Sequence, residues 1–167
     1  EKITTCEPFK DSLIELNASG DCRINDKGLK NCNKIQKLNA GDNEKITTCK
    51  PFKDSLIELN ACYDCGINDK KLKNCNKIKI LNAEDNKKIT TCKPFSNTLI
   101  ELNAGDNCGI NDEGLKNCHK IQILNASFKK YITTCQPFKD TLIELNASGN
   151  CGINDEGLKN CHKIQIL

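Results

Sequence analysis

The sequence lacks tryptophan and methionine, and aromatic residues make up only 4% of its 167 positions. Apolar residues amount to 37%, which is too little bulky material for a large globular core. No long apolar run occurs, so we expect no membrane-spanning segment. The 25 basic and 22 acidic side chains leave a net charge of +3, which gives little support to a nucleic-acid partner.

Histidine is scarce as well, with only His119 and His162 present. No Ser/His/Asp grouping and no glycine-rich phosphate loop occurs, although each histidine follows a cysteine, Cys118 or Cys161. The only close cysteine pair, Cys62-x-x-Cys65, has no second pair to complete a zinc site. We therefore expect no enzyme, no cofactor and no metal centre.

What the chain does contain is a repeat. The string ITTC recurs every 43 residues, and so does the string C-x-I-N-D-x-x-L-K-N-C. Each 43-residue unit divides into coils of 22 and 21 residues, because L/I-x-x-L-N-A occurs twice per unit. We expect one array of about eight coils, or four double units, over residues 1–167. The chain begins in mid-coil and stops in mid-strand, so we expect a window of a longer array. Coils start at Leu13, Ile35, Leu56, Ile78, Leu99, Ile121, Leu142 and Ile164.

Within a coil the pattern is L-x-x-L-x-A-x-x-N-x-x-I, and it resembles the leucine-rich repeat family over the whole chain. The longer coil, read from Cys22 through Asn25-Asp26 to Cys32 and Ile35, resembles the cysteine-containing class found in F-box adaptor proteins, with shorter coils. The resemblance implies an α/β solenoid with a right-handed coil and a parallel concave sheet. We expect an Asp cap and a short helical turn on the return of the longer coil, and extended or 3₁₀ geometry at the proline of the shorter one.

Thirteen cysteines admit either a disulfide scaffold or a reduced chain. Cysteines of one column recur only in every second coil, about 10 Å apart, which is too far for a disulfide. Different columns fall at different places around the coil, so we expect no regular pairing. The interpretation is that the thiols are small buried fillers, which favours a reducing intracellular compartment and leaves a secreted or surface location open.

Two columns at the end of the strand have expected structural roles. An Asn column should satisfy backbone groups in the turn, while Lys129 breaks it and predicts a locally irregular coil. A column of cysteines just after the strands is expected to fill apolar space in the core. The structural residues are Asn43, Asn86, Asn107 and Asn150, with Cys22, Cys65, Cys108 and Cys151.

Outward strand positions form the predicted concave binding face, which is acidic and carries exposed isoleucine and aromatic side chains. Its asparagine column is either a hydrogen-bonded structural ladder or part of the recognition surface. Acidic groups beside apolar ones are typical of a protein-binding patch and would repel phosphates. The candidate partner-binding residues are Glu58, Tyr63, Ile80, Asn82, Glu101, Asn103, Ile123, Asn125, Phe128 and Glu144.

The leading hypothesis is a scaffold that binds a protein partner, of basic character, on this face. The alternative is a structural repeat protein that stacks head to tail into a filament or surface assembly, because the units are nearly identical. An adaptor role in ubiquitin ligation is a third hypothesis, which rests on the family resemblance alone.

Overall fold

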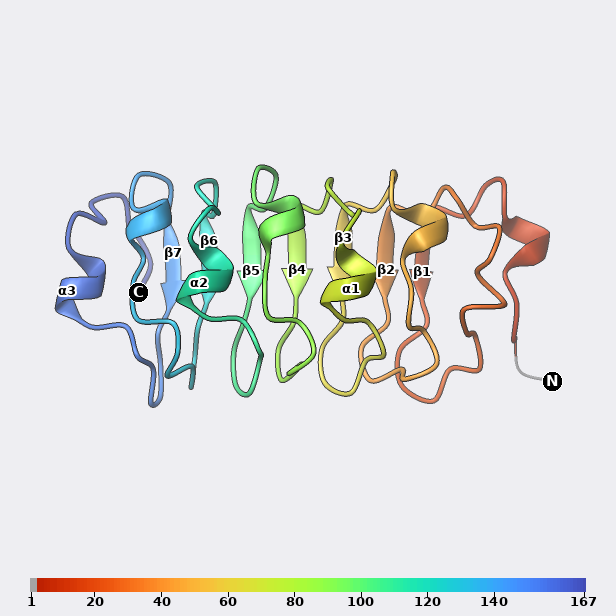
Figure 1. Ribbon diagram of the computed structural model, residues 1–167, viewed down its shortest axis with the longest axis horizontal. Helices are drawn as coiled ribbons and strands as arrows, with labels where there is room; N and C mark the ends of the chain where they lie inside the picture. Colours follow the sequence, from red (N-terminus) through yellow and green to blue (C-terminus); the bar gives the residue numbers. More distant parts are fainter. Residues whose placement is uncertain (1–2) are drawn as a thin grey trace.

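The computed structural model describes residues 3–167 as a row of stacked coils with the strands side by side (Figure 1). Each of the first seven strand-bearing coils contributes three residues to a parallel sheet, and the order in the sheet follows the order in the chain. The eighth coil adds an isolated bridge between Ile166 and Glu144. The strands are β1 (Glu15–Asn17), β2 (Lys37–Asn39), β3 (Glu58–Asn60), β4 (Ile80–Asn82), β5 (Glu101–Asn103), β6 (Ile123–Asn125) and β7 (Glu144–Asn146).

At the second and third positions of the strands the register pairs like residues with like. Leu16 of β1 lies opposite Leu38 of β2, and Asn17 lies opposite Asn39. The ladder continues beyond the strands, because the Ala18 amide donates to the Asn39 carbonyl at 2.8 Å. Period-two alternation sends the central leucine of each strand inward and leaves the first and third residues facing out.

The return segments differ between the two coil types, as expected. In the shorter coils a proline in the first turn starts a 3₁₀ segment, because its fixed φ suits that position. In the longer coils a short helix forms in all but the first, where residues 26–32 make only turns. The 3₁₀ segments are η1 (Glu7–Phe9), η2 (Lys50–Phe52), η3 (Lys93–Phe95) and η4 (Gln136–Phe138), and the helices are α1 (Asp69–Leu72), α2 (Asp112–Leu115) and α3 (Asp155–Leu158).

The expected Asp cap on these helices is wrong. At α2 the preceding residue, Asn111, accepts the Gly114 amide through its side chain at 3.0 Å. The Asp112 carboxylate instead reaches the next coil, where it accepts the Thr133 amide at 2.9 Å and the Thr133 hydroxyl at 2.6 Å. We call this contact the Asp–Thr clamp; it recurs as Asp26–Thr47 and Asp69–Thr90.

The core is a thin apolar layer between the sheet and the return segments. Small alanines behind the strands are fully buried, and the opposite wall supplies the phenylalanines Phe52, Phe95 and Phe138. Phe9, in the first coil, is exposed. Gly114 shows how closely coils approach, because a Cβ there would lie 2.3 Å from the Thr90 carbonyl oxygen. Stability in such an array comes from contacts between neighbouring coils.

Within residues 3–167, no helix has the length and apolar character needed to cross a membrane.

Candidate binding face

The outward residues of the strands form two straight rows, which we call the sheet face. In the first row glutamates alternate with other residues, so Glu58, Glu101 and Glu144 are separated by isoleucines. In the second row every residue is asparagine, from Asn17 to Asn146. The sequence-predicted strand residues therefore lie together: Glu58, Ile80, Asn82, Glu101, Asn103, Ile123, Asn125 and Glu144.

One glutamate of the first row is already paired. Lys37 Nζ of β2 lies 2.8 Å from Glu58 Oε1 of β3, and both side chains remain partly open to solvent. Glu101 and Glu144 lie instead beside isoleucines in the register. The central and C-terminal part of the sheet face is thus the part where carboxylates and apolar side chains alternate.

The asparagines do not form the amide ladder that was one of the two sequence-based interpretations. Each Oδ1 accepts the backbone amide two residues on, for example Gly105 N to Asn103 at 3.1 Å. This Asx turn ends every strand in the same way. The Nδ2 groups stay on the outward side, and among the described residues of this row only that of Asn103 donates to another side chain, Glu84 Oε2 at 3.3 Å. The row therefore has a structural function and also presents amide donors.

Three residues beyond each strand the backbone adopts a left-handed conformation, with φ between 53° and 69°. Most coils place glycine or aspartate there, residues that tolerate this region. Two coils place an aromatic residue there instead, Tyr63 and Phe128, each at φ 56°. We call this the left-handed row; it comprises Gly20, Asp42, Tyr63, Asp85, Asp106, Phe128 and Gly149.

Both aromatic residues of the left-handed row are exposed. Tyr63 is 49% and Phe128 58% accessible. Carboxylates surround Tyr63, and the negative charge of Glu84 raises the pKa of its phenol. The Phe128 ring lies over Gly149, where a Cβ would fall 2.4 Å from Cε1. The rim of the sheet face thus combines acidic groups with aromatic rings.

The structural asparagines divide into two groups. Asn43 and Asn86 are buried, and their Nδ2 atoms donate to the carbonyls of Ala18 and Ala61 at 2.6 Å. Asn107 and Asn150, predicted to do the same, are exposed. In these longer coils the turn is shifted by one residue, so the following cysteine, Cys108 or Cys151, points inward instead.

Lys129 occupies the position of Asn43 in its own coil and is buried there. Its Nζ donates to the Cys108 carbonyl and lies 5.8 Å from the centre of the Tyr131 ring. The local irregularity expected at Lys129 is absent, because β6 keeps its register with both neighbours. A lysine ammonium therefore stands in place of the asparagine amide, but it donates to the Cys108 carbonyl, whereas Asn43 and Asn86 donate to the carbonyls of Ala18 and Ala61.

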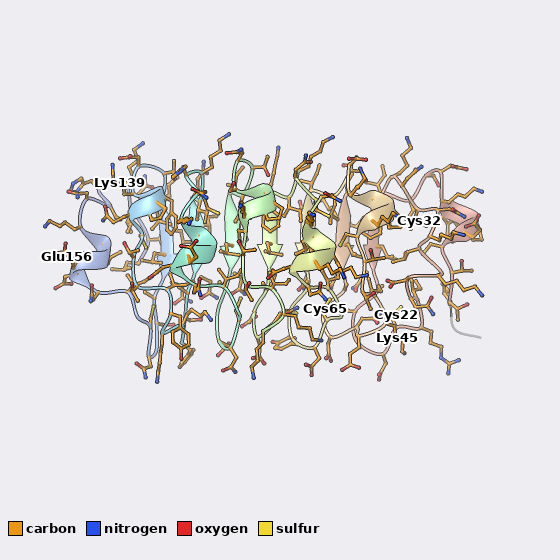
Figure 2. All side chains as sticks on the ribbon, viewed as in Figure 1. Cys22, Cys32, Lys45, Cys65, Lys139 and Glu156 are labelled. Atoms are coloured by element: carbon orange, nitrogen blue, oxygen red, sulfur yellow. The ribbon has the colours of Figure 1, made fainter. Side chains whose placement is uncertain are left out.

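The thirteen cysteines are free thiols, eleven of them buried and two, Cys22 and Cys151, partly exposed. The labelled members show how the columns lie, with Cys22 and Cys65 in the turns after the strands and Cys32 beside the returns (Figure 2). Two columns of cysteines nevertheless bring their thiols close together. Cys49 and Cys75 hydrogen-bond through their thiols across neighbouring coils, and Cys92 does the same with Cys118.

Other features of the surface are weaker candidates for a binding site than the sheet face. A groove covers β1 to β4 on the sheet face, whereas the hollow beside α2 on the opposite side is lined by polar groups such as Thr90, Glu113 and Lys116. His119 Nδ1 lies 2.8 Å from the Pro137 carbonyl oxygen. No three potential metal ligands gather within residues 3–167.

Solved structures with this fold include two internalins from Listeria monocytogenes. Internalin C2 aligns with a TM-score of 0.75 at 20% identity, covering 96% of this chain and 73% of its own. The internalin inlF aligns with a TM-score of 0.56 at 16% identity, covering 96% and 68%. Internalins are leucine-rich repeat proteins, so the predicted solenoid is confirmed as the fold, while the cysteine-containing subclass is not. No family model and no curated protein matches the sequence.

Proposed function

We propose that this leucine-rich-repeat solenoid is a protein-binding scaffold without catalytic activity, and that its partner lies on the sheet face. The observation that carries the proposal is the left-handed row. Tyr63 and Phe128 occupy a backbone conformation that costs a bulky residue on the order of 1–3 kcal/mol, and both rings point to solvent. Exposed aromatic residues held at such positions are better explained by a partner than by folding.

The chemistry of the face favours a basic partner. Asp42, Asp85 and Asp106 of the left-handed row flank the aromatic residues, and Glu101 and Glu144 lie on the strands. A positively charged partner would meet complementary charge at the rim and apolar contact at Ile123 and Phe128. The outward amide groups of Asn82, Asn103 and Asn125 would donate to carbonyl oxygens of an extended segment. The fold shared with internalins supports a scaffold in general terms and names no partner.

The test is a charge reversal on the sheet face. The double variant Glu101→Lys and Ile123→Lys places two cations at its centre, so proteins captured by the immobilised wild-type chain from a lysate of its own source should be lost, about tenfold or more. Quantitative mass spectrometry of the captured proteins and thermal unfolding of each variant are the two measurements.

The matched control is Glu113→Lys with Asn117→Lys. Both residues are exposed beside α2, and the pair changes the net charge by the same amount. This control should capture the same proteins as wild type. Equal capture by the sheet-face variant would contradict the proposal, and equal loss in both variants would show a general charge effect rather than a defined face.

A second candidate is assembly of copies end to end. The observation that favours it is the repetition of coil-to-coil contacts, since the Asp–Thr clamp and the Asn43-type bond recur with the 43-residue period. A coil of one copy would present the same partners to a coil of another. Light scattering over a range of concentrations tests this, because assembly requires the mass to rise with concentration, and a constant monomer mass would contradict it.

A further inference from the structure

Each 43-residue unit brings two cysteines together across neighbouring coils. Cys49 and Cys75 are fully buried and hydrogen-bond through their thiols, as do Cys92 and Cys118. Cys6 contacts Cys32 in the same way in the first unit. In the last unit Cys161 is the neighbouring group that most raises the pKa of Cys135, after burial itself. The members of all four pairs are 26 residues apart: Cys6 and Cys32, Cys49 and Cys75, Cys92 and Cys118, Cys135 and Cys161.

The spacing of 26 residues has a simple geometric origin. Cys6 lies beside Gly28 of the next coil, because its amide donates to the Gly28 carbonyl at 3.0 Å. Cys32 closes the turn that follows Gly28, because its amide donates to the Leu29 carbonyl at 3.0 Å, and its thiol there contacts that of Cys6. One coil plus one turn therefore aligns the two thiols. The amide of Cys92 donates to Gly114, and that of Cys135 to Gly157, in the same manner.

A third cysteine lies near each pair but is placed differently. Cys65 follows Cys49 by 16 residues and raises the pKa of Cys49 only through its charge. Cys75 raises that pKa mainly through a direct hydrogen bond. The same order holds at Cys92, where Cys118 is the hydrogen-bond partner and Cys108 the more distant group. The contacts therefore select one of the two partners that the cysteine of each ITTC string has within its unit.

We propose that these four thiol pairs are disulfide sites, which close when the chain folds in the presence of a low-molecular-weight disulfide such as oxidised glutathione. Two S–H bonds break and one S–S bond forms for each pair. The two electrons pass to the glutathione disulfide, whose own S–S bond is cleaved, and the two protons leave with the resulting pair of glutathione thiols or with solvent.

The two thiols of a pair differ in reactivity. The thiolate of Cys75 accepts a hydrogen bond from Cys49, which lowers the pKa of Cys75 and raises that of Cys49. The same asymmetry holds for Cys118 and Cys92. Cys75 and Cys118 are therefore the more acidic thiols of their pairs once the coils have packed. Because the thiols are buried once the coils have packed, the exchange belongs to folding, when the two coils approach each other.

The proposal also bears on location. In a reducing compartment the pairs remain thiols and act as apolar filler, as in this structure. In an oxidising compartment each pair ties one coil to the next, which suits a small array with a thin core. The same sequence is thus compatible with either environment.

The experiment is refolding of the full chain in a glutathione redox buffer, followed by alkylation and non-reducing tryptic mapping of the monomer with native circular dichroism. Four bridges are expected, each joining an ITTC-containing peptide to an NCNK or NCHK peptide. Because NCNK and NCHK each occur twice, the variants Cys75→Ala and Cys118→Ala assign them: the bridge from the Cys49 peptide should disappear in the first and that from the Cys92 peptide in the second, while those from Cys6 and Cys135 remain. Cys65→Ala, in the same unit, is the matched control and should retain the Cys49 bridge.

Two readouts decide the matter. The bridged monomer should unfold roughly 5–10 °C above the reduced one, and Cys75→Ala should lose part of that gain. Bridges between cysteines 16 residues apart overturn the proposal. So does a native-like monomer whose thirteen thiols are all alkylated after denaturation. Failure of the oxidised sample to regain the native fold, when the reduced sample does regain it, overturns the proposal as well.

Discussion

At the scale of single residues, the left-handed row shows how one backbone position can be used for folding or for recognition. Asp42, Asp85 and Asp106 tolerate its positive φ, and Gly20 and Gly149 do so without a Cβ. Tyr63 and Phe128 share the conformation without any such tolerance. A substitution in this row can therefore change binding without lowering the stability of the fold.

The variant Tyr63→Asn should demonstrate this separation. Asparagine favours the left-handed region, so the free energy of unfolding should stay the same or rise by about 0.5–1 kcal/mol. Capture of the partner should fall, because the exposed ring is lost. Urea denaturation and the capture assay measure the two effects. Asp85→Asn is the matched control in the same row, and a Tyr63→Asn variant that binds as well as wild type would remove Tyr63 from the interface.

Lys129 allows a second residue-scale prediction. Lys129→Met leaves the Cys108 carbonyl without its donor and should cost about 1–3 kcal/mol of unfolding free energy. Lys129→Asn restores the side chain of Asn43 and Asn86, whose amides donate to the Ala18 and Ala61 carbonyls, so it should bond the corresponding Ala104 carbonyl and cost less. Urea denaturation of both variants checks the difference. Equal losses would mean that the lysine stem, and not its donor, stabilises this coil.

The sequence predicted the strand residues of the sheet face correctly, because a period of two assigns them directly. It could not predict that Asn107 and Asn150 are exposed. A one-residue shift of the turn places the neighbouring cysteine, instead of the asparagine, at the inward position. Either residue type can occupy that position, so the sequence does not distinguish the two. The shift becomes visible only when the hydrogen bonds of Asn43 are compared with the burial of Cys108.

At the scale of elements, contacts between neighbouring coils replace those of a globular core. The Asp–Thr clamp is the clearest example, because the first residue of α2 serves the next coil rather than its own helix. Sequence reasoning recognised Asp112 as a capping residue since aspartate at a helix start usually caps it. The neighbouring Asn111 already fills that role, and the sequence holds no signal that ranks the two.

The clamp can be measured against an internal control. Asp112→Ala should lower the free energy of unfolding by about 1–2 kcal/mol more than Asp155→Ala. Both aspartates begin equivalent helices, and Asp155 has no Asp–Thr clamp within residues 3–167. Both variants remove a charge from the first turn of a helix. The difference between their losses of unfolding free energy therefore measures the contact of Asp112 with Thr133. Equal losses would show that the clamp contributes nothing.

At the scale of the whole molecule, the buried thiols make stability depend on alkaline pH. Burial raises the pKa of Cys65 and Cys108 to about 11 and that of Cys135 to about 12, from 9.0 when unfolded. Below pH 9 both states hold these protons. Above it the unfolded chain releases them first, so stability falls as the pH rises from 9 toward 11 or 12, by roughly 3 kcal/mol for each of Cys65 and Cys108 and roughly 4 kcal/mol for Cys135.

Urea denaturation of the reduced protein at pH 8 and pH 10.5 checks this prediction. Lys129 acts in the opposite direction, because burial lowers the pKa of its ammonium group. The Lys129→Met background removes that opposing effect and should show the larger loss. Replacing Cys65 and Cys108 by alanine should reduce the loss, and a stability that is flat over this range would contradict the burial of these thiols.

The long-range order of the molecule was also the easiest part to predict, since a strict period fixes the coils. The thiol pairs were missed for the same reason. Comparison of residues within one column found only separations of two coils, whereas the contact joins Cys49 to Cys75, which belong to different columns of adjacent coils. A search for recurring separations between columns would have found the 26-residue spacing.

The alternation of glutamate with isoleucine fixes the spacing of carboxylates along the solenoid axis. Parallel strands lie about 4.8 Å apart, so carboxylates such as Glu101 and Glu144 recur about every 9.6 Å along the axis. A polyproline II helix advances about 3.1 Å per residue with three residues per turn, so every third side chain returns to the same face after about 9.3 Å. A ligand running along the array would keep step if its cationic side chains came at every third position, and a different interval would drift out of phase within a few coils.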